Sequence, residues 1–215
     1  MTKIMIELFS GSKVMSETFK KNGYDVFTID FNKKLKPDLV VNILDFDISM
    51  LPDKFKSPEV IWSSPPCTTF SIASLGHYWL NMKPRRHETY IGLAIAKKNL
   101  EIIEQLNPKY WFIENPLALL RHQSFMLKLP RVSLNYCQYG EDSQKPTDIW
   151  TNSGFVPRPR CKSGDNCHVP APRGSKTGTQ GKSCNFTRSK IPIKLCEEIA
   201  NVCERKTKII QGVLQ

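Results

Sequence analysis

The chain has 215 residues, 40% of them hydrophobic, and a formal net charge of +11. Its length and apolar content indicate one ordered globular domain, or one domain with a small appendage, and exclude a disordered chain. The sequence contains no run of about 20 apolar residues and no signal-peptide cleavage pattern, so we expect no membrane span and no secretion signal. The positive charge favours a polyanionic partner, nucleic acid before an anionic membrane surface, although a generally basic soluble protein fits it equally well.

The seven cysteines are an odd number, and four of them lie in segments with the pattern of regular structure, namely Cys67, Cys137, Cys196 and Cys203. This distribution favours free thiols in a reducing, cytoplasmic setting over a secreted disulfide scaffold. Nothing in the sequence indicates a protein partner or an oligomer.

Short β-like runs alternate with helical runs over the first two thirds of the chain. Strands are expected at residues 3–8, 24–30, 38–43, 59–64 and 109–115, and helices at 12–23 and 87–107. Strands separated by helices predict βαβ units, and hence an α/β fold with a mostly parallel sheet and helices on both faces.

The residue pattern of the sequence changes after residue 130. Two more strands are expected at 131–140 and 146–152, followed by a loop-rich segment and a helix at 191–206 that has proline in its first turn. We therefore expect three parts: a catalytic domain (1–151), a small basic insert containing cysteine and histidine (152–190), and a C-terminal helical segment that packs back on the catalytic domain (191–215).

The residues best suited to binding or catalysis directly follow the expected strands. They are Glu7 to Gly11, Asp30, Asp45, Ser64 to Cys67, and Glu114 to Pro116. Ligands of parallel α/β sheets bind outside the carboxyl ends of the strands. This clustering predicts a single site at one edge of the sheet.

A nucleoside-containing cofactor is suggested by the first two of these groups. Gly11 lies in the turn "LFSGSKVMS", where a glycine lets the backbone approach a ligand closely, although the dinucleotide pattern G-x-G-x-x-G is absent. Asp30 follows the next strand, and a carboxylate about 20 residues beyond such a turn can accept both ribose hydroxyls. Alone, Asp30 would be interpreted as a solvated residue at the end of a strand.

Cys67 stands directly behind two prolines in "VIWSSPPCTTFS". The prolines restrict the backbone and would hold a nucleophilic thiol in a rigid loop, whereas a lone cysteine is more often inert and buried. Glu114 closes another strand in "FIENP", where a carboxylic acid beside a thiol suits general acid chemistry on a heteroaromatic ring. The pairing favours function for both residues.

Five segments together carry a resemblance to a known family. The segments "LFSGSKVMS", "TIDFN", "SSPPCTTFS", "FIENP" and "QYGEDSQKPTDIW" occur in the order and spacing of the DNA (cytosine-5) methyltransferases. The chain resembles a short, phage-type member of that family over roughly residues 3–151.

The resemblance implies a Rossmann-like fold that binds S-adenosylmethionine. By similarity, the cofactor-binding residues would be Phe9, Ser10 and Gly11 at the methionine end, Asp30 at the ribose, Asp45 at the adenine, and Pro65. The substrate would be a cytosine flipped out of DNA, at a cost of a few kcal/mol. Cys67 would attack its C6 atom, while Glu114 would hold N3 and the exocyclic amine.

Two departures from the family pattern bear on the substrate. The family's Gln-x-Arg-x-Arg element is replaced by "QKPTDIW", which leaves Lys145, with Thr147 as the second candidate, for the role of touching the base. The usual large target-recognition domain is missing, and only the 152–190 insert could replace it. The same chemistry on RNA or a free cytosine nucleotide therefore stays an alternative, as does a non-catalytic nucleic-acid-binding module.

The insert contains Cys161, Cys167, His168 and Cys184, a set that could hold a structural zinc ion. The spacing lacks Cys-x-x-Cys, and we expect that the adjacent Cys167 and His168 do not easily bind one ion together. Basic residues of the insert and of the loop after Cys67 suit phosphate contacts, with a solvated surface as the alternative. The expected nucleic-acid contacts are Arg85, Arg86, Arg173 and Lys176.

Overall fold

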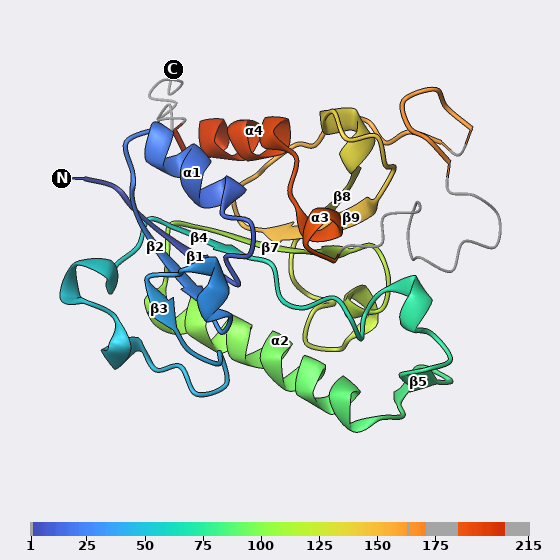
Figure 1. The fold of residues 1–215 in the computed structure, drawn as a ribbon, viewed down its shortest axis with the longest axis horizontal. Coiled ribbons are helices and arrows are strands. Elements are labelled where there is room, and N and C mark those ends of the chain that lie inside the picture. The colour runs from blue at the N-terminus through green and yellow to red at the C-terminus, as the bar shows by residue number, and fades with distance from the viewer. Residues whose placement is uncertain (1, 163, 171–184, 205–215) are drawn as a thin grey trace, which may run out of the picture.

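The computed structural model of the protein describes residues 2–162, 164–170 and 185–204. A seven-stranded sheet runs through the centre of the molecule (Figure 1). Its strands are β1 (Ile4–Leu8), β2 (Asp25–Asp30), β3 (Leu39–Val40), β4 (Val60–Ser63), β7 (Tyr110–Pro116), β8 (Arg131–Asn135) and β9 (Pro146–Thr151). Their spatial order is β3-β2-β1-β4-β7-β9-β8, and only β9 runs against its neighbours. The prediction of a mostly parallel, Rossmann-like α/β sheet is confirmed.

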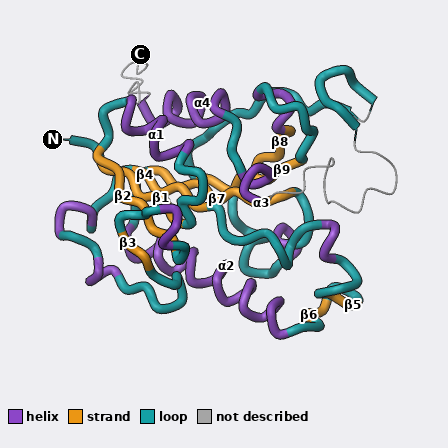
Figure 2. The backbone as a smooth tube through the Cα atoms, in the orientation of Figure 1, coloured by secondary structure: helices purple, strands orange, loops and turns teal. Residues whose placement is uncertain are grey.

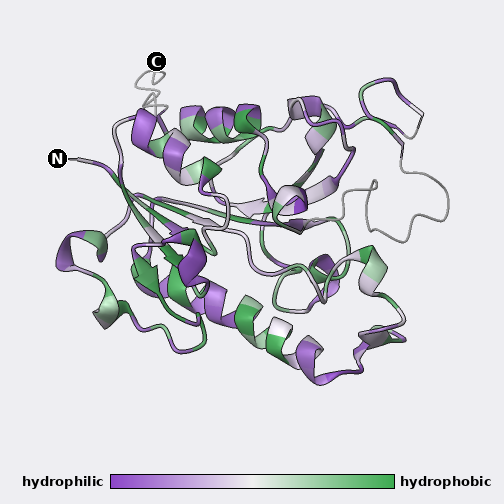
Figure 3. Ribbon diagram, viewed as in Figure 1, coloured by the Kyte–Doolittle hydropathy of each residue, from purple (hydrophilic) through white to green (hydrophobic). Residues whose placement is uncertain are grey.

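Helices cover both faces of this sheet (Figure 1). Helices α1 (Val14–Lys21) and α4 (Ile193–Glu204) lie together on one face, and the long α2 (His87–Leu106) crosses the other. Short α3 (Asn185–Ser189) and the small hairpin of β5 (Trp79–Leu80) and β6 (Lys83–Pro84) complete the described α-helices and strands, and short 3-10 turns connect several of them. In Figure 3, the visible ribbons of α1 and α4 carry both apolar (green) and polar (purple) stretches.

The sequence of β1 shows how the two faces are built. Met5 belongs to the buried cluster under α1 and α4, whereas Ile6 and Leu8 belong to the cluster under α2. Successive side chains of a strand point to opposite faces, so one apolar run supplies both layers of the core. Glu7 points to the same face as Met5 and reaches Ser16 of α1 with its carboxylate.

Two expected strands are shorter by four or more residues in the structure, and in both cases a local turn ends them. The strand expected at 38–43 pairs only at Leu39–Val40, because the side chain of Asn42 accepts a hydrogen bond from the Leu44 amide and closes a turn. The strand expected at 131–140 ends at Asn135. The chain then forms the 3-10 turn η6 (Tyr136–Tyr139), which is closed by Gly140 at φ 94°.

From the end of β9 to residue 170, the described residues form loops and turns (Figure 2). Phe155 at the start of this segment is 3% exposed and packs in the same cluster as Ile191 and Leu195, which lie at the beginning of the C-terminal segment. Among the described residues, no helix combines the length and the apolar character needed to cross a bilayer.

Candidate active site

The expected cofactor residues lie where the order of the sheet reverses. Strands β2 and β3 extend from one side of β1, and β4 and β7 extend from the other, so the carboxyl ends of β1 and β4 flank a topological switch point. The loop after β1 is tightly wound, with positive φ values at Phe9 (59°), Gly11 (44°) and Lys13 (57°). The Ser10 hydroxyl is buried and has no hydrogen-bond partner among the described residues. A tightly wound, partly buried loop with an unpaired buried hydroxyl fits a polar ligand.

Asp30 holds the loop after β1 against the end of β2. Its carboxylate accepts hydrogen bonds from the Gly11 amide (3.1 Å) and the Asn32 amide (2.9 Å), and the residue is 8% exposed. The two expected cofactor groups, the loop and the carboxylate, are therefore in direct contact. Asp45 lies farther along the chain in the exposed loop after β3.

Glu7 lies on β1, one residue before the carboxyl end of the strand, and is 3% exposed. It accepts hydrogen bonds from the backbone amide and the hydroxyl of Ser16 at the start of α1. Burial raises the pKa of its carboxyl to about 7, more than these hydrogen bonds and the charge of Lys13 lower it.

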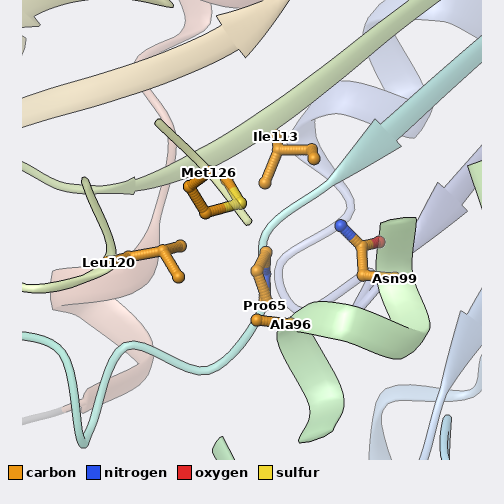
Figure 4. Close-up of a pocket in the computed structure, with 6 residues that line it drawn as sticks. All are labelled: Pro65, Ala96, Asn99, Ile113, Leu120 and Met126. Carbon is orange, nitrogen blue, oxygen red and sulfur yellow. The ribbon is translucent and has the colours of Figure 1, made fainter. Parts of the chain in front are cut away.

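The loop from Ser64 to Cys67 is anchored by its first proline. Pro65 is buried in a small pocket whose other lining residues come from α2, β7 and the segment after β7: Ala96, Asn99, Ile113, Leu120 and Met126 (Figure 4). The Asn115 side chain also donates to the Pro65 carbonyl across 2.9 Å. Two residues further on, Cys67 is exposed. A buried anchor followed by an exposed thiol is the arrangement that a positioned nucleophile requires.

Glu114 lies opposite this loop at the end of β7 and is 6% exposed. The Tyr136 hydroxyl donates to its Oε1 across 2.9 Å, and the Lys145 ammonium lies 3.8 Å from the same oxygen. Lys145 also stacks over the Tyr136 ring, with 4.2 Å between Nζ and the ring centroid. Burial and the neighbouring carboxylate raise the pKa of the Tyr136 phenol well above its ordinary value, so this group stays a donor.

The charges around Glu114 also act on Cys67. Although the residue is exposed at the surface, desolvation of the thiol raises its pKa, and the Glu114 carboxylate raises it further. The positive charges of Lys145 and Arg188 lower it. The structure thus brings the three residues expected to be catalytic, Cys67, Glu114 and Lys145, into one electrostatic neighbourhood.

The residues expected to contact nucleic acid fall into two groups. Arg85 and Arg86 lie on the loop between Cys67 and α2, where their guanidinium groups donate to the carbonyls of Gly76 (3.1 Å) and His77 (3.0 Å). They therefore brace their own loop, and contact with DNA stays a prediction. Arg173 and Lys176 lie outside the described residues.

The expected metal ligands are only partly brought together. Cys161, Cys167 and His168 converge with Cys137 of η6, and one ligand atom from each of the four lies within 4.8 Å of all the others. The fourth expected ligand, Cys184, lies outside the described residues. The Cys167 Sγ and the His168 Nδ1 lie 3.4 Å apart, so these adjacent side chains face a common point.

Sequence reasoning missed three residues of this neighbourhood. Cys137 was assigned to regular structure, and Tyr136 was assigned to the same strand, whereas both lie on η6. Asn115 was placed in the predicted site only as a member of the Glu114 to Pro116 segment, without a role of its own. The glycine at 140 was a usable signal, since it indicates that the strand ends before it.

The sequence matches the model of one protein family, C-5 cytosine-specific DNA methylase, over residues 4–135. A curated relative from Frog virus 3 (isolate Goorha), named probable DNA (cytosine-5)-methyltransferase, is 27% identical over 221 residues. The match covers 93% of this chain and 99% of the viral protein.

Solved structures are similar in fold. A methyltransferase of Entamoeba histolytica superposes with a TM-score of 0.50 at 14% identity, over 77% of this chain and 58% of that protein. A DNMT2 structure from Spodoptera frugiperda gives a TM-score of 0.46 at 21% identity, over 79% of this chain and 58% of that protein. The chain therefore spans little more than half the length of these two structures.

Proposed function

Because the chain belongs to the C-5 cytosine-specific DNA methylase family, we propose that it transfers a methyl group from S-adenosylmethionine to C5 of cytosine in DNA. The reaction runs through a covalent bond between Cys67 and C6 of the base. The observation that carries this proposal is the convergence of an exposed, loop-held thiol, a buried carboxylate with a tyrosine donor, and a lysine beside that carboxylate.

The cofactor occupies the switch point at the carboxyl ends of β1 and β4. Phe9, Ser10 and Gly11 hold its methionine end, Asp30 its ribose and Asp45 its adenine, with Pro65 at the side of the Cys67 loop. The unpaired Ser10 hydroxyl supports this placement, since a bound polar group would satisfy it. When bound, S-adenosylmethionine supplies the methyl group that the activated C5 accepts.

The chain's own groups activate and release the base. The Cys67 thiolate adds to C6, and the electron pair of the C5–C6 double bond makes C5 nucleophilic. Glu114 holds N3 and the exocyclic amine of cytosine, and Tyr136 and Lys145 fix the position of that carboxylate. After C5 has gained its methyl group, a base removes the C5 proton, the double bond reforms, and the C6–S bond breaks to release the thiolate.

The base reaches Cys67 only after it leaves the duplex. Arg85 and Arg86 lie on the loop beside the site, and residues 152–190 form a reduced target-recognition region between the catalytic domain (1–151) and the C-terminal segment (191–215). We place the reaction in the cytoplasm of a bacterial or phage-infected cell, where DNA and the methyl donor are found together.

The proposal is tested by incubating the full chain with radiolabelled S-adenosylmethionine and duplex DNA, and measuring label in 5-methylcytosine. Cys67→Ala should abolish the label and leave cofactor binding intact, whereas Cys203→Ala, a buried cysteine of α4, should keep it. Label that persists in Cys67→Ala would exclude this nucleophile. DNA containing 5-fluorocytosine should trap the adduct, because C5 then carries no proton to lose, and the trapped mass should be absent from Cys67→Ala.

The same assay separates the remaining substrates. Label in RNA or in free cytidine nucleotides, with none in duplex DNA, would move the activity to those molecules. Absence of label from all three substrates, together with absence of cofactor binding, would leave a non-catalytic nucleic-acid-binding module.

A further inference from the structure

We propose that Cys137, Cys161, Cys167 and His168 bind a structural zinc ion, and that this ion positions the partners of Glu114. Cys137 belongs to η6, directly after β8, and the other three residues belong to the loop that follows β9. The four ligand atoms therefore join two parts of the chain that are separated by a strand. Zinc is not needed for the proposed methyl transfer, so its role here is structural.

The spacing of the ligand atoms fits a tetrahedral metal. The Cys137 Sγ lies 3.2 Å from the Cys161 Sγ and 3.6 Å from the Cys167 Sγ. The His168 Nδ1 lies 3.4 Å from the Cys167 Sγ and 3.8 Å from the Cys161 Sγ. With Zn–S bonds of about 2.3 Å, tetrahedral geometry places sulfur atoms about 3.8 Å apart, with sulfur–nitrogen separations slightly shorter.

The donor set also selects the kind of metal. Three thiolates and one imidazole form a closed structural zinc site and disfavour hard cations such as Mg²⁺ and Ca²⁺, which prefer oxygen. A disulfide between two of the cysteines would leave the third thiol and the imidazole unexplained. A shared metal accounts for the convergence of all four groups.

Two amide side chains complete the surroundings of the sulfur atoms. Gln138 Nε2 lies 3.3 Å from the Cys167 Sγ, and Gln144 Nε2 lies 3.4 Å from the Cys161 Sγ, both in donor positions. Three thiolates around one divalent ion carry a net negative charge, which such donors stabilise. The sulfur atoms thus already have the hydrogen bonds that metal-bound thiolates receive.

A metal ion would fix the loop that follows β9. Between β9 and residue 170, the described residues contain no helix or strand, and Val156 and Val169 are 83% and 66% exposed. Besides the buried Phe155, the loop is held by polar contacts near its start: the Arg158 guanidinium pairs with Glu198 (2.7 Å), and the Arg160 guanidinium donates to the Asn135 side chain (2.8 Å). A metal would supply the stability that this small core does not.

Residues of the proposed zinc site and its surroundings are adjacent in sequence to the two residues that contact Glu114. Cys137 follows Tyr136, whose hydroxyl donates to Glu114, and Gln144 precedes Lys145, whose ammonium lies beside the same oxygen. The Tyr136 amide also donates to the Gln144 carbonyl across 2.9 Å, so these two segments move together. The ion therefore acts as a positioning element for Glu114, and this part of the inference rests on the proposed function.

Metal content of the full chain is the first test and requires no enzymatic activity. Elemental analysis of the purified protein should find about one zinc ion per chain. Cys137→Ser and His168→Ala should lose it, whereas His168→Cys, which makes a four-thiolate site, should keep it. Cobalt in place of zinc should give the absorption of a tetrahedral thiolate complex.

Cys184→Ser is the matched control for the ligand set. It should keep the zinc, because Cys137 takes the place that the sequence assigned to Cys184. Loss of zinc in Cys184→Ser and its retention in Cys137→Ser would overturn the set proposed here. A wild-type chain without metal, or one in which thiol titration finds a disulfide between these cysteines, would overturn the site itself.

The positioning role is tested by a double-mutant cycle. His168→Ala should lower kcat about tenfold and change the dissociation constant of S-adenosylmethionine little, and His168→Cys should restore kcat. Tyr136→Phe should retain zinc and lower kcat to a similar extent. If the ion acts through Tyr136, the double variant should lose no more than either single variant. Full additivity would overturn the coupling but not the metal site, and the methyl-transfer proposal would stand on its own assay.

Discussion

The Asn115 side-chain amide donates to the Pro65 carbonyl across 2.9 Å in the interior of the protein. Asn115 directly follows Glu114 on β7, and Pro65 lies two residues before Cys67 on the loop after β4. One buried hydrogen bond therefore sets the separation between the strand that carries the proposed acid and the loop that carries the proposed nucleophile. Since Asn115 is fully buried, the bond is shielded from competition with water.

We expect Asn115→Ala to lower kcat for methyl transfer at least about tenfold, because loss of a buried hydrogen bond of about 1–3 kcal/mol releases the loop. Binding of S-adenosylmethionine should change little. The control is Asn22→Ala, which removes an amide-to-carbonyl bond of the same 2.9 Å length at the end of α1. Equal losses in the two variants would show that Asn115 supports only general stability.

The charges around Cys67 should be visible in its pH-dependent reactivity. The Glu114 carboxylate raises the pKa of the thiol and Lys145 lowers it, so Glu114→Gln should move its alkylation profile to lower pH and Lys145→Met to higher pH. The measurement is the rate of iodoacetamide reaction at the Cys67 peptide, followed by mass spectrometry. Lys109→Met should leave the profile in place. Shifts of the opposite sign would show that the two side chains do not face the thiol.

Glu7 should make the protein less stable as pH rises. The pKa of its carboxyl is about 7 in the folded state, above the ordinary 4.5, so the folded state binds more protons between these values. The contribution of Glu7 to the free energy of unfolding should thus be at its full value below pH 4.5. It should fall by about 3 kcal/mol as the pH rises through 7. Urea unfolding at several pH values should show this fall in the wild type.

The matched variant is Glu7→Gln, which keeps the shape of the side chain without the charge. Its unfolding free energy should lack this pH-dependent fall and should exceed that of the wild type above pH 7. Glu17→Gln, on the exposed side of α1, should follow the wild type. A Glu7→Gln curve parallel to that of the wild type would show that Glu7 titrates normally.

Gly92 should resist a substitution that usually stabilises helices. Alanine inside a helix is favoured over glycine by about 1 kcal/mol, but a Cβ at Gly92 would clash with the Thr69 hydroxyl on the Cys67 loop. Gly92→Ala should therefore lower both the melting temperature and kcat. Adding Thr69→Ala removes the clashing atom and should restore the melting temperature. A melting temperature that rises in the single variant would contradict the contact.

Much of the fold follows from periodicity. The runs at 3–8, 24–30, 59–64 and 109–115 became β1, β2, β4 and β7, with ends that differ by at most one residue from those expected. Buried parallel strands are short and continuously apolar, so they are easy to recognise. The edge strand β3 and the end of β8 were less predictable, because a side-chain bond at Asn42 and the turn before Gly140 decided where they stop.

The proposed metal ligands show the limit of local reasoning. Cys161, Cys167 and His168 are close in sequence and could be grouped from it, whereas Cys137 joins them only because β8 and η6 bring it there. Sequence spacing instead suggested Cys184. Which cysteine completes such a set depends on distances across the fold, and the order of residues along the chain does not contain them.

By itself, the sequence determined the α/β class, the family, and the residue types at the carboxyl ends of the strands. These depend on local patterns, since each strand and each motif is a contiguous stretch of chain. The tertiary structure alone decided which of those ends meet: Asn115 on the Pro65 carbonyl, Tyr136 and Lys145 on Glu114, and Cys137 in the cysteine–histidine cluster. The physical reason is that strand order is set by packing of whole elements against one another, so the partners of a catalytic group come from segments that are distant along the chain.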